Sequence, residues 1–245
     1  MPGHWALHLN GVGPKCHYHL WVVCPCCSGK GVARKCYGSM DLVLVSDTHC
    51  FFPDIPEGDI LVHCGDISSQ GTRSEIQRGI SWLNEQPHRF KILIAGNHDF
   101  GLERNSREFD WGDVIYLENN YTTIKGLKIY GSPITPEFYN WAFMCPRGAR
   151  IRRVWGAIPL DTDILITHGP PMGIGDLVRG RHAGCIELLN KVREVKPKLH
   201  AFGHIHEGYG YYVSEDIPGT LFANVSCCTG GYAPTNDPMT FEVRV

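Results

Sequence analysis

Five short clusters of residues that commonly bind metal ions occur in order along this 245-residue chain. Each cluster follows an apolar run rich in Val, Ile and Leu, such as DLVLVSD or DILVHCGD. Apolar runs of this length are typical of buried strands, so we expect the clusters at strand ends. The clusters are Asp47-Thr48-His49, Gly65-Asp66, Gly96-Asn97-His98-Asp99, Thr167-His168-Gly169 and Gly203-His204-Ile205-His206. Because ligands bind at the carboxyl edge of the strands in open α/β sheets, the clusters are expected to converge on one site.

The ordered set carries far more information than any one cluster, since a lone Asp-x-His or His-x-His arises often by chance. Together the clusters supply the nitrogen and oxygen ligands of a two-metal hydrolytic site. Two divalent ions about 3.5–4 Å apart can activate water, orient a phosphate ester and offset the charge that develops on it. Mixed imidazole and oxygen ligands suit Mn, Fe, Zn, Co or Ni better than Ca, and the sequence leaves the metal open.

These motifs resemble those of the calcineurin-like metallophosphoesterase superfamily, which run D-x-H, G-D, G-N-H-[DE], H and G-H-x-H in that order. The resemblance covers residues 41–245. The stretches LKIYGSP, FYNWAF, DTDILITHGPP and LHAFGHIHEGYG are further similar to the small metallophosphoesterase-domain subgroup related to class III cyclic-nucleotide phosphodiesterases. The resemblance implies an α/β fold, a four-layer sandwich in which two mixed β-sheets face each other with helices outside.

The resemblance also implies a role for each matching residue. Asp66 would bridge both ions through its carboxylate and would thereby serve catalysis. The other ligands would be Asp47, His49 and His206 for the first ion, and Asn97, His168 and His204 for the second.

By the same resemblance His98 faces the substrate and does not bind metal. It would protonate the leaving alkoxide or stabilise the charge on the phosphoryl group, because an imidazole with its ordinary pKa near 6.5 can donate a proton near neutral pH. Asn97 would contact the substrate as well. Asp99 has two interpretations: it accepts the other imidazole N–H of His98 and fixes its tautomer, or it begins a helix or turn.

Three features beside the motifs have a functional and a structural interpretation. In the aromatic loop from Pro133 to Pro146, Tyr139 and Trp141 either stack on a nucleobase or form a packed satellite core. His182, between Arg181 and Ala183 and close to Arg179, either binds phosphate or lies in a solvated loop. His63 and His200, which lie within predicted strands, are expected to be packed side chains without a catalytic role.

The composition limits the classes of partner. The chain has 23 Lys plus Arg and 25 Asp plus Glu, a formal net charge of −2, so no basic excess points to nucleic acid. Its apolar stretches are shorter than the roughly 20 residues that cross a bilayer. The early LWVVC run is followed directly by PCC, which does not resemble a signal-peptide cleavage site, so a cytoplasmic location is expected. The oligomeric state cannot be read from the sequence.

The resemblance divides the chain into a catalytic domain over residues 40–245 and an unmatched, Cys-rich extension over residues 1–39. The extension either stays flexible or binds a structural zinc ion. Its candidate zinc ligands are Cys16, His17, His19, Cys24, Cys26, Cys27 and Cys36. Cys64, Cys145 and Cys185 lie in or beside motif segments and are expected as free thiols. Cys50, directly after the first cluster, is expected to be sensitive to oxidation.

Two helices are predicted on the outside of the sheets. Residues 72–86 place Ile76, Ile80 and Leu83 on one stripe behind a Thr72 or Ser74 cap, and Pro87 ends the helix. Residues 184–195 likewise place Ile186, Leu189 and Val192 on one stripe, and this helix ends before Pro197.

Three hypotheses for function follow. The first is a metal-dependent phosphodiesterase acting on small phosphodiesters such as cyclic nucleotides. The second is a phosphomonoesterase or protein phosphatase with the same metal chemistry. The third is a weakly active or inactive metal-binding scaffold protein, although every ligand position and His98 are filled in this chain.

Overall fold

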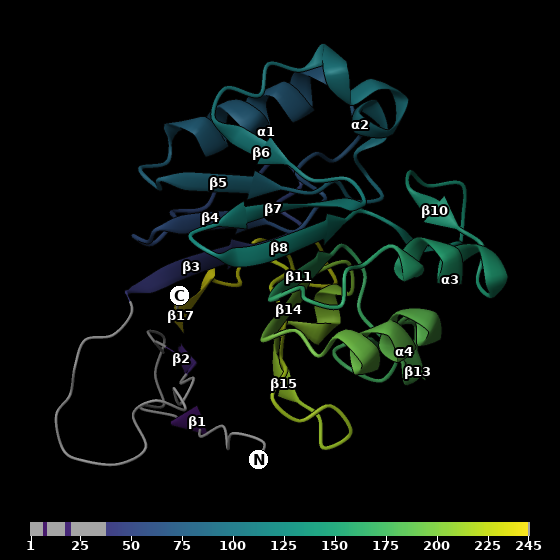
Figure 1. The fold of residues 1–245 in the computed structure, drawn as a ribbon. Helices are drawn as coiled ribbons and strands as arrows, with labels where there is room; N and C mark the ends of the chain where they lie inside the picture. Colours follow the sequence, from purple (N-terminus) through teal and green to yellow (C-terminus); the bar gives the residue numbers. More distant parts are fainter. Residues whose placement is uncertain (1–6, 9–17, 21–37, 245) are drawn as a thin grey trace, which may run out of the picture.

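The structure is a computed structural model that describes residues 7–8, 18–20 and 38–244. Two β-sheets face each other, with one pair of helices outside each sheet (Figure 1). The predicted four-layer α/β architecture is therefore confirmed.

The first sheet has seven strands and is mixed. Strands β3 to β6 are parallel to one another, and β17 runs antiparallel to β3. In spatial order the strands are β1 (Leu7–His8), β2 (Tyr18–Leu20), β17 (Met239–Arg244), β3 (Ser39–Val45), β4 (Ile60–His63), β5 (Phe90–Leu93) and β6 (Val114–Tyr116).

The second sheet has six strands and is also mixed, with four parallel strands in its centre and an antiparallel strand at each edge. In spatial order they are β15 (Gly210–Val213), β16 (Leu221–Asn224), β14 (Leu199–Phe202), β11 (Ile164–Thr167), β8 (Leu127–Ser132) and β7 (Asn120–Ile124). Two small pairs lie outside the sheets: β9 (Thr135–Pro136) with β10 (Met144–Cys145), and β12 (Leu177–Val178) with β13 (Arg181–His182).

Alternating side chains of the strands build three separate layers of core. In β3, Leu42 and Leu44 pack between the two sheets, whereas Val43 and Val45 pack under the helices of the first sheet. This alternation follows from the two-residue period of a strand, and it explains why the strands read as continuous apolar runs: both faces are buried.

Helix α1 (Arg73–Glu85) agrees closely with the predicted helix 72–86. The Thr72 side chain accepts a hydrogen bond from the Glu75 amide, and the Glu75 carboxylate accepts one from the Thr72 amide, so a capping box begins the helix. The predicted stripe Ile76, Ile80 and Leu83 is fully buried against the first sheet.

Helix α4 (Ile186–Val195) packs on the second sheet, but its predicted stripe is wrong at one position. Ile186 is 41% exposed, and Leu188 and Val195 are buried beside Leu189 and Val192 instead. The buried residues lie on one face of the helix, and Ile186 lies just outside that face. Cys185 precedes the helix, and its sulfur accepts a hydrogen bond from the Leu188 amide.

The shorter helical segments were not predicted from the sequence because they are brief or carry weak periodicity. They are α2 (Phe100–Asn105), α3 (Ala149–Gly156), η2 (Ser106–Glu108) and η3 (His206–Gly208). Helix α3 packs against α4 through Ile151 and Trp155, outside the second sheet.

The candidate zinc ligands Cys16, His17, Cys24, Cys26, Cys27 and Cys36 lie outside the described residues. The division of the chain at residue 40 stays a prediction. Within the described part of the chain, none of the helices has the length and apolar character needed to cross a membrane.

Candidate active site

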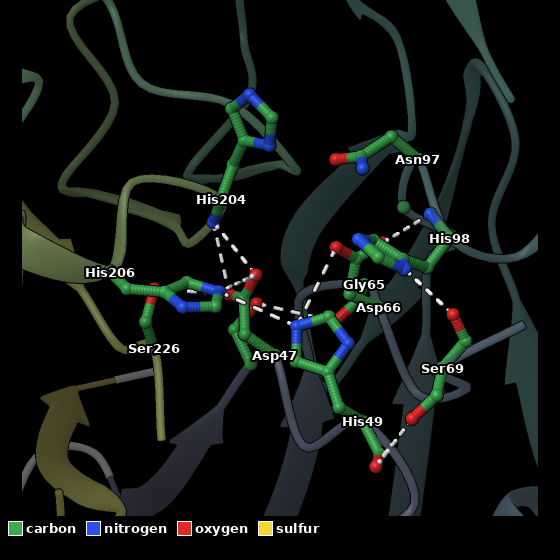
Figure 2. Close-up of polar contacts among 12 residues, drawn as sticks. Asp47, His49, Gly65, Asp66, Ser69, Asn97, His98, His204, His206 and Ser226 are labelled. Atoms are coloured by element: carbon green, nitrogen blue, oxygen red, sulfur yellow. Dashed lines mark hydrogen bonds and ion pairs between the residues drawn. The ribbon is translucent and has the colours of Figure 1, made fainter. Parts of the chain in front are cut away.

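The predicted ligands lie in the loops that follow five strands, and the two sheets bring these loops together. Loops after β3, β4 and β5 supply Asp47, His49, Asp66, Asn97 and His98 from the first sheet. Loops after β11 and β14 supply His168, His204 and His206 from the second sheet. The predicted convergence at strand ends is therefore observed, and Figure 2 shows most of these side chains around one centre.

One group of potential ligand atoms consists of Asp47, His49 and His206. The His206 Nε2 lies 3.2 Å from the Asp47 Oδ1 and 3.4 Å from the His49 Nε2. These three residues come from both sheets and are all buried or nearly so.

A second group consists of Asp47, Asp66 and His168. The His168 Nε2 lies 3.3 Å from the Asp66 Oδ2 and 2.9 Å from the Asn97 Oδ1. The same Asp66 oxygen lies 3.9 Å from the His49 Nε2. Asp66 therefore stands between the two groups, as a bridging carboxylate must.

Three histidines turn their Nε2 atoms toward the site. The Nδ1 atoms of His49, His168 and His206 lie 3.3, 3.0 and 3.0 Å from the carbonyl oxygens of Ser68, Cys64 and Thr229. A carbonyl only accepts hydrogen bonds, so each Nδ1 carries a hydrogen, and Nε2 is the ring nitrogen left to face the other ligand atoms.

This arrangement fits a divalent cation. Acceptor nitrogens and carboxylate oxygens packed a few ångströms apart in a buried site repel one another unless a proton or a metal ion lies between them. A neutral imidazole whose other nitrogen donates to a carbonyl is the usual form of a metal-binding histidine.

Charge interactions within the site shift the pKa values of its histidine and aspartate side chains. Burial alone would lower the pKa of His168, but the adjacent Asp66 carboxylate outweighs it and raises this pKa to about 9. Burial likewise opposes ionisation of Asp66, yet His168 holds the pKa of that carboxyl below its ordinary value. Burial lowers the pKa of His204 to about 3, so this imidazole is neutral.

Several of the predicted ligands have a strained backbone. Asp47, His49, Asp66 and His204 have φ angles of 52°, 44°, 55° and 67°, in the left-handed region that non-glycine residues rarely adopt. Such conformations persist where the surrounding structure imposes them, which is common at functional sites.

The glycines of the motifs give the carboxylates room to approach. A Cβ atom on Gly96 would lie 2.3 Å from the Asp66 Oδ1, and one on Gly203 would lie 2.0 Å from the Asp47 Oδ2. Any side chain at either position would displace a carboxylate from the site.

His98 forms a third group of potential ligand atoms with His49 and Asp66, and it lines the adjacent cavity. Its Nδ1 lies 2.7 Å from the Ser69 carbonyl oxygen, and its backbone amide donates to the Asp66 Oδ1 at 2.7 Å (Figure 2). Its ring packs on Trp141, with 4.4 Å between centroids. The Ser69 carbonyl therefore fixes the tautomer of His98 with Nδ1 protonated.

The interpretation that Asp99 orients His98 is wrong. The Asp99 carboxylate accepts hydrogen bonds from the Gly96 amide at 2.8 Å, the Ser68 amide at 3.0 Å and the Ser68 hydroxyl at 2.6 Å. The alternative, that Asp99 begins a helix, is borne out in position: Asp99 is the N-cap residue of α2 and its backbone carbonyl accepts from the Leu102 amide, although its side chain makes no capping hydrogen bond. Asp99 instead ties the loop after β4 to the loop after β5, and burial raises its pKa to about 6.

His204 takes a different position from the other predicted ligands. Its backbone amide donates to the Asp47 carboxylate, at 2.9 Å from Oδ2, while its ring points away from that carboxylate (Figure 2). The ring lies 5.1 Å from the His168 ring and 5.4 Å from the Phe138 ring. It lines the cavity but belongs to none of the three groups of potential ligand atoms among the described residues.

A cavity of about 480 Å³ opens over the site. Asp66, Asn97, His98, His204 and His206 lie on its surface. Aromatic side chains provide much of the remaining wall, namely Phe138, Tyr139, Trp141 and Tyr232. Tyr139 is 72% exposed, whereas Trp141 packs against both His98 and Phe100.

Sequence reasoning missed Tyr232. Its ring lies 5.0 Å from the His49 ring and 5.1 Å from the His206 ring, so it covers the Asp47, His49 and His206 group from the cavity side. It occurs in a Gly-rich loop far from every motif, and no signal in the sequence distinguishes it. Ser226, whose hydroxyl lies 3.0 Å from the Asp47 Oδ2, was missed for the same reason.

The two strand histidines that were expected to be plain packed side chains have specific partners. The His63 Nε2 lies 2.9 Å from the hydroxyl of Thr48, the residue between Asp47 and His49. The His200 Nε2 lies 2.8 Å from the hydroxyl of Thr167, the residue before His168. Both imidazoles are completely buried, and burial lowers both pKa values to about 3.

The calcineurin-like phosphoesterase family model matches residues 40–208. The chain belongs to this family. It is 39% identical over 241 residues to metallophosphoesterase domain-containing protein 1 of Homo sapiens, covering 86% of this chain and 73% of that protein. It is 34% identical over 228 residues to a UPF0046 protein of Caenorhabditis elegans, covering 82% of this chain and 80% of that protein.

A solved structure shows the same fold at low sequence identity. A protein of Thermus thermophilus superposes with a TM-score of 0.52 and 14% identity, over 76% of this chain and 89% of that chain. The calcineurin-like phosphoesterase family consists of metal-dependent hydrolases, and the His and Asp groups described above are consistent with its two-metal chemistry.

Proposed function

We propose that this calcineurin-like phosphoesterase is a two-metal phosphodiesterase that hydrolyses small phosphodiesters such as cyclic nucleotides. The observation that carries the proposal is the position of Asp66 between two groups of buried ligands, with His98 beside it in a cavity. The 39% identity to a metallophosphoesterase domain-containing protein supports the narrower subgroup to which the sequence motifs are similar.

The residues divide into two ligand sets that share Asp66. Asp47, His49 and His206 would complete the first set, and Asn97, His168 and His204 the second. Two divalent ions, of Mn, Fe, Zn, Co or Ni, would supply Lewis-acid activation of the phosphate ester and of water. Carbonyl oxygens hold the Nδ1 atoms of His49, His168 and His206, so Nε2 is the nitrogen through which each of these residues would bind an ion.

His98 would act as the general acid. The Ser69 carbonyl holds the hydrogen on its Nδ1, so Nε2 is the atom that can carry a proton to the leaving alkoxide. The packing of Trp141 on the His98 ring restricts rotation of the imidazole. Tyr139, with its largely exposed ring on the cavity wall, is better placed than Trp141 to stack on a base.

The test compares hydrolysis of bis-p-nitrophenyl phosphate and p-nitrophenyl phosphate with added Mn²⁺ or with a chelator. The wild type should turn over the diester faster in a metal-dependent manner. Asp66→Asn should lose activity and bound metal together, because the shared carboxylate is then neutral. Asp161→Asn, which removes a carboxylate that is 71% exposed, is the matched control and should keep both.

Preference for the monoester would favour the phosphomonoesterase hypothesis. Two tightly bound ions per chain with no turnover of either ester would favour the scaffold hypothesis. Metal analysis by mass spectrometry separates these outcomes, since it measures the site independently of activity.

A further inference from the structure

A short hairpin forms part of the cavity wall opposite the metal-binding loops of the first sheet. It consists of β12 and β13 joined at Arg179 and Gly180, whose φ angles are 48° and 78°. Positive φ at both turn residues is typical of a two-residue type I′ turn. Strand β12 contacts η3, which begins at His206, so the hairpin lies directly beside the candidate site.

A buried carboxylate holds this hairpin in place. Asp176 is 1% exposed; its Oδ1 lies 2.7 Å from the His182 Nδ1, and its Oδ2 accepts from the amides of Gly173 and Gly184, both at 2.9 Å. A buried carboxylate is tolerated only when it is well hydrogen-bonded, so these bonds fix both ends of the segment. His182 is thus committed to the hairpin through its Nδ1, and its predicted role in binding phosphate receives no support.

Arg147 joins the same wall from a different segment. Its Nη1 donates to the Gly184 carbonyl and its Nη2 to the Ala183 carbonyl, each at 2.8 Å, and the side chain lines the cavity. Carbonyl groups are neutral, so these two hydrogen bonds do not compensate the guanidinium charge. An arginine has five N–H donors, so Arg147 has others for a ligand in the cavity.

Arg181 is placed on the cavity side of the hairpin by its register. Val178 pairs directly with Arg181, and directly paired residues project from the same face of a hairpin. Val178 lines the cavity and Arg181 is exposed, so the Arg181 side chain leaves the hairpin on the cavity side, although it is not among the residues that line the cavity itself. Leu177 and His182 occupy the opposite face.

Among the described residues, Glu187 lies close enough to Arg147 to interact with its charge and Glu207 lines the same cavity, but neither carboxylate forms an ion pair with Arg147 or Arg181. Asp176 is engaged as described, and the Glu187 Oε1 accepts from the Gly148 amide at 2.7 Å. Within the described part of the chain, neither Arg147 nor Arg181 forms an ion pair with a carboxylate, in contrast to Arg193, which pairs with Asp216. Arg147 on the cavity wall and Arg181 on the adjacent face of the hairpin are therefore two guanidinium groups without an ion-pair partner beside the candidate phosphoesterase centre.

We propose that Arg147 and Arg181 form a second anion-binding subsite, which takes a carboxylate or phosphate carried by the substrate beyond the phosphoryl group that is hydrolysed. Guanidinium groups bind such planar or tetrahedral anions through paired hydrogen bonds. The inference deepens the proposed function and rests on it. Among small phosphodiesters it predicts a preference for those with a second negative group on one ester arm over simple cyclic nucleotides, whose only negative group is the diester itself.

The test uses two diesters that differ by one carboxylate: phenyl 4-nitrophenyl phosphate and 4-carboxyphenyl 4-nitrophenyl phosphate. With Mn²⁺ present, wild-type KM should be about tenfold lower for the carboxylated diester, the size expected for a charge-assisted hydrogen bond. Arg181→Gln should abolish this ratio. Arg179→Gln removes the same charge from the turn of the same hairpin and should retain the ratio.

Binding is measured separately so that absence of hydrolysis does not decide the question. Calorimetric titration of the metal-loaded protein with phenylphosphonate and 4-carboxyphenylphosphonate should show the same preference, even if neither diester is hydrolysed. Equal affinity of wild type for both phosphonates would overturn the subsite. Equal loss of preference in Arg179→Gln and Arg181→Gln would also overturn it, because a general electrostatic attraction would then explain the effect.

Arg147→Gln is a second probe of the same subsite. Because this side chain also bonds two carbonyls of the hairpin, thermal unfolding must first show that the variant is folded. A folded Arg147→Gln protein should lose most of the preference for the carboxylated phosphonate. Full retention of the preference in that protein would contradict the assignment of Arg147.

Discussion

The two sheets contribute differently to the candidate site. Both carboxylates, Asp47 and Asp66, come from loops of the first sheet, as does His98. The second sheet supplies only imidazoles, namely His168, His204 and His206. The first sheet thus supplies the carboxylates that would hold cations and the proposed general acid, while the second sheet would complete the coordination with imidazole nitrogens.

The site has two halves, one supplied by the loops of each sheet, and behind the proposed ligands both halves have the same arrangement. In each, a completely buried strand histidine bonds the hydroxyl of a threonine that adjoins a proposed ligand: His63 with Thr48, and His200 with Thr167. Neither imidazole is a ligand. Each therefore acts on the site only by positioning the loop that carries one.

The two histidines differ in how many of their ring nitrogens have a hydrogen-bond partner. The His63 Nδ1 accepts from the Gly65 amide at 3.3 Å, so its Nε2 carries the hydrogen and donates to Thr48. Thr167 donates its one hydroxyl hydrogen to the Gly169 carbonyl at 2.7 Å, so His200 must also donate through Nε2. The His200 Nδ1 then has no partner among the described residues. Hydrogen bonds therefore fix the histidine of the first half more completely than the histidine of the second half.

The largest expected effect concerns His98, the proposed general acid, which the first half supplies. His98→Ala should lower kcat about 10²–10⁴-fold for diesters with poor leaving groups, the usual contribution of a general acid. The loss should be much smaller for p-nitrophenyl esters, whose leaving group needs little protonation. Bound metal should stay at the wild-type level because His98 is outside the two proposed ligand sets. Equal losses for good and poor leaving groups would exclude the role of general acid.

A comparison of His63→Phe with His200→Phe tests the difference in hydrogen bonding between the two histidines directly. Loss of His63 leaves the Gly65 amide and the Thr48 hydroxyl without partners, whereas Thr167 still donates to Gly169 when His200 is lost. A buried polar group without a partner costs about 1–3 kcal/mol, so His63→Phe should lower the free energy of unfolding more.

Metal dissociation constants provide the readout that a purely structural role would not change. Removal of a group that orients a ligand typically weakens metal binding about 10–100-fold, and we expect His63→Phe in that range. His200→Phe should weaken it less. Equal effects of the two substitutions on metal affinity would show that the two halves are equivalent and break the comparison.

The sequence predicted which side chains come together at the site, but it did not predict their supports, for physical reasons that individual residues illustrate. Asp47, Asp66 and His168 each follow an apolar run that can only be a buried strand, so both the element and the edge were readable. The tautomer of His98 depends on the Ser69 carbonyl, and any residue supplies a carbonyl. Asp99 was misassigned because its partners, Gly96 and Ser68, are identified only when the two loops are seen side by side.

The helices show the same limit. The stripe of α1 follows from its period and its capping box, both of which are local. The exposure of Ile186 in α4 depends on how that helix is rotated on the second sheet, which no local pattern specifies. Tyr232 reaches the site through a loop that the sequence cannot place.

A smaller effect concerns acid stability of the second half. Burial lowers the pKa of His200 to about 3, against 6.5 for an ordinary histidine, so the folded state keeps this ring neutral while the unfolded chain binds a proton below pH 6.5. The stability that this neutral ring allows is present above pH 6.5 and is lost as the pH falls toward 3, by up to about 1.4 kcal/mol per pH unit.

His200→Phe should therefore flatten the pH dependence of unfolding. Between pH 7 and 5 the wild type should lose about 2 kcal/mol more than the variant, as measured by urea unfolding at each pH. Parallel stability curves for the two proteins would mean that His200 does not stay neutral in the folded state.

The smallest expected effect concerns a thiol in the first half that has no counterpart in the second. Cys50 follows His49 and is partly exposed, whereas burial raises the pKa values of Cys227 and Cys228 to about 12 and about 11 and makes these thiols inert. Cys50→Ser should keep the wild-type rate with reductant present and should lose less activity after exposure to peroxide. Cys145→Ser, at another partly exposed cysteine, is the matched control and should remain as sensitive as wild type. Equal protection by both substitutions would place the sensitive group elsewhere, and the first half would then lose its proposed sensitivity to oxidation.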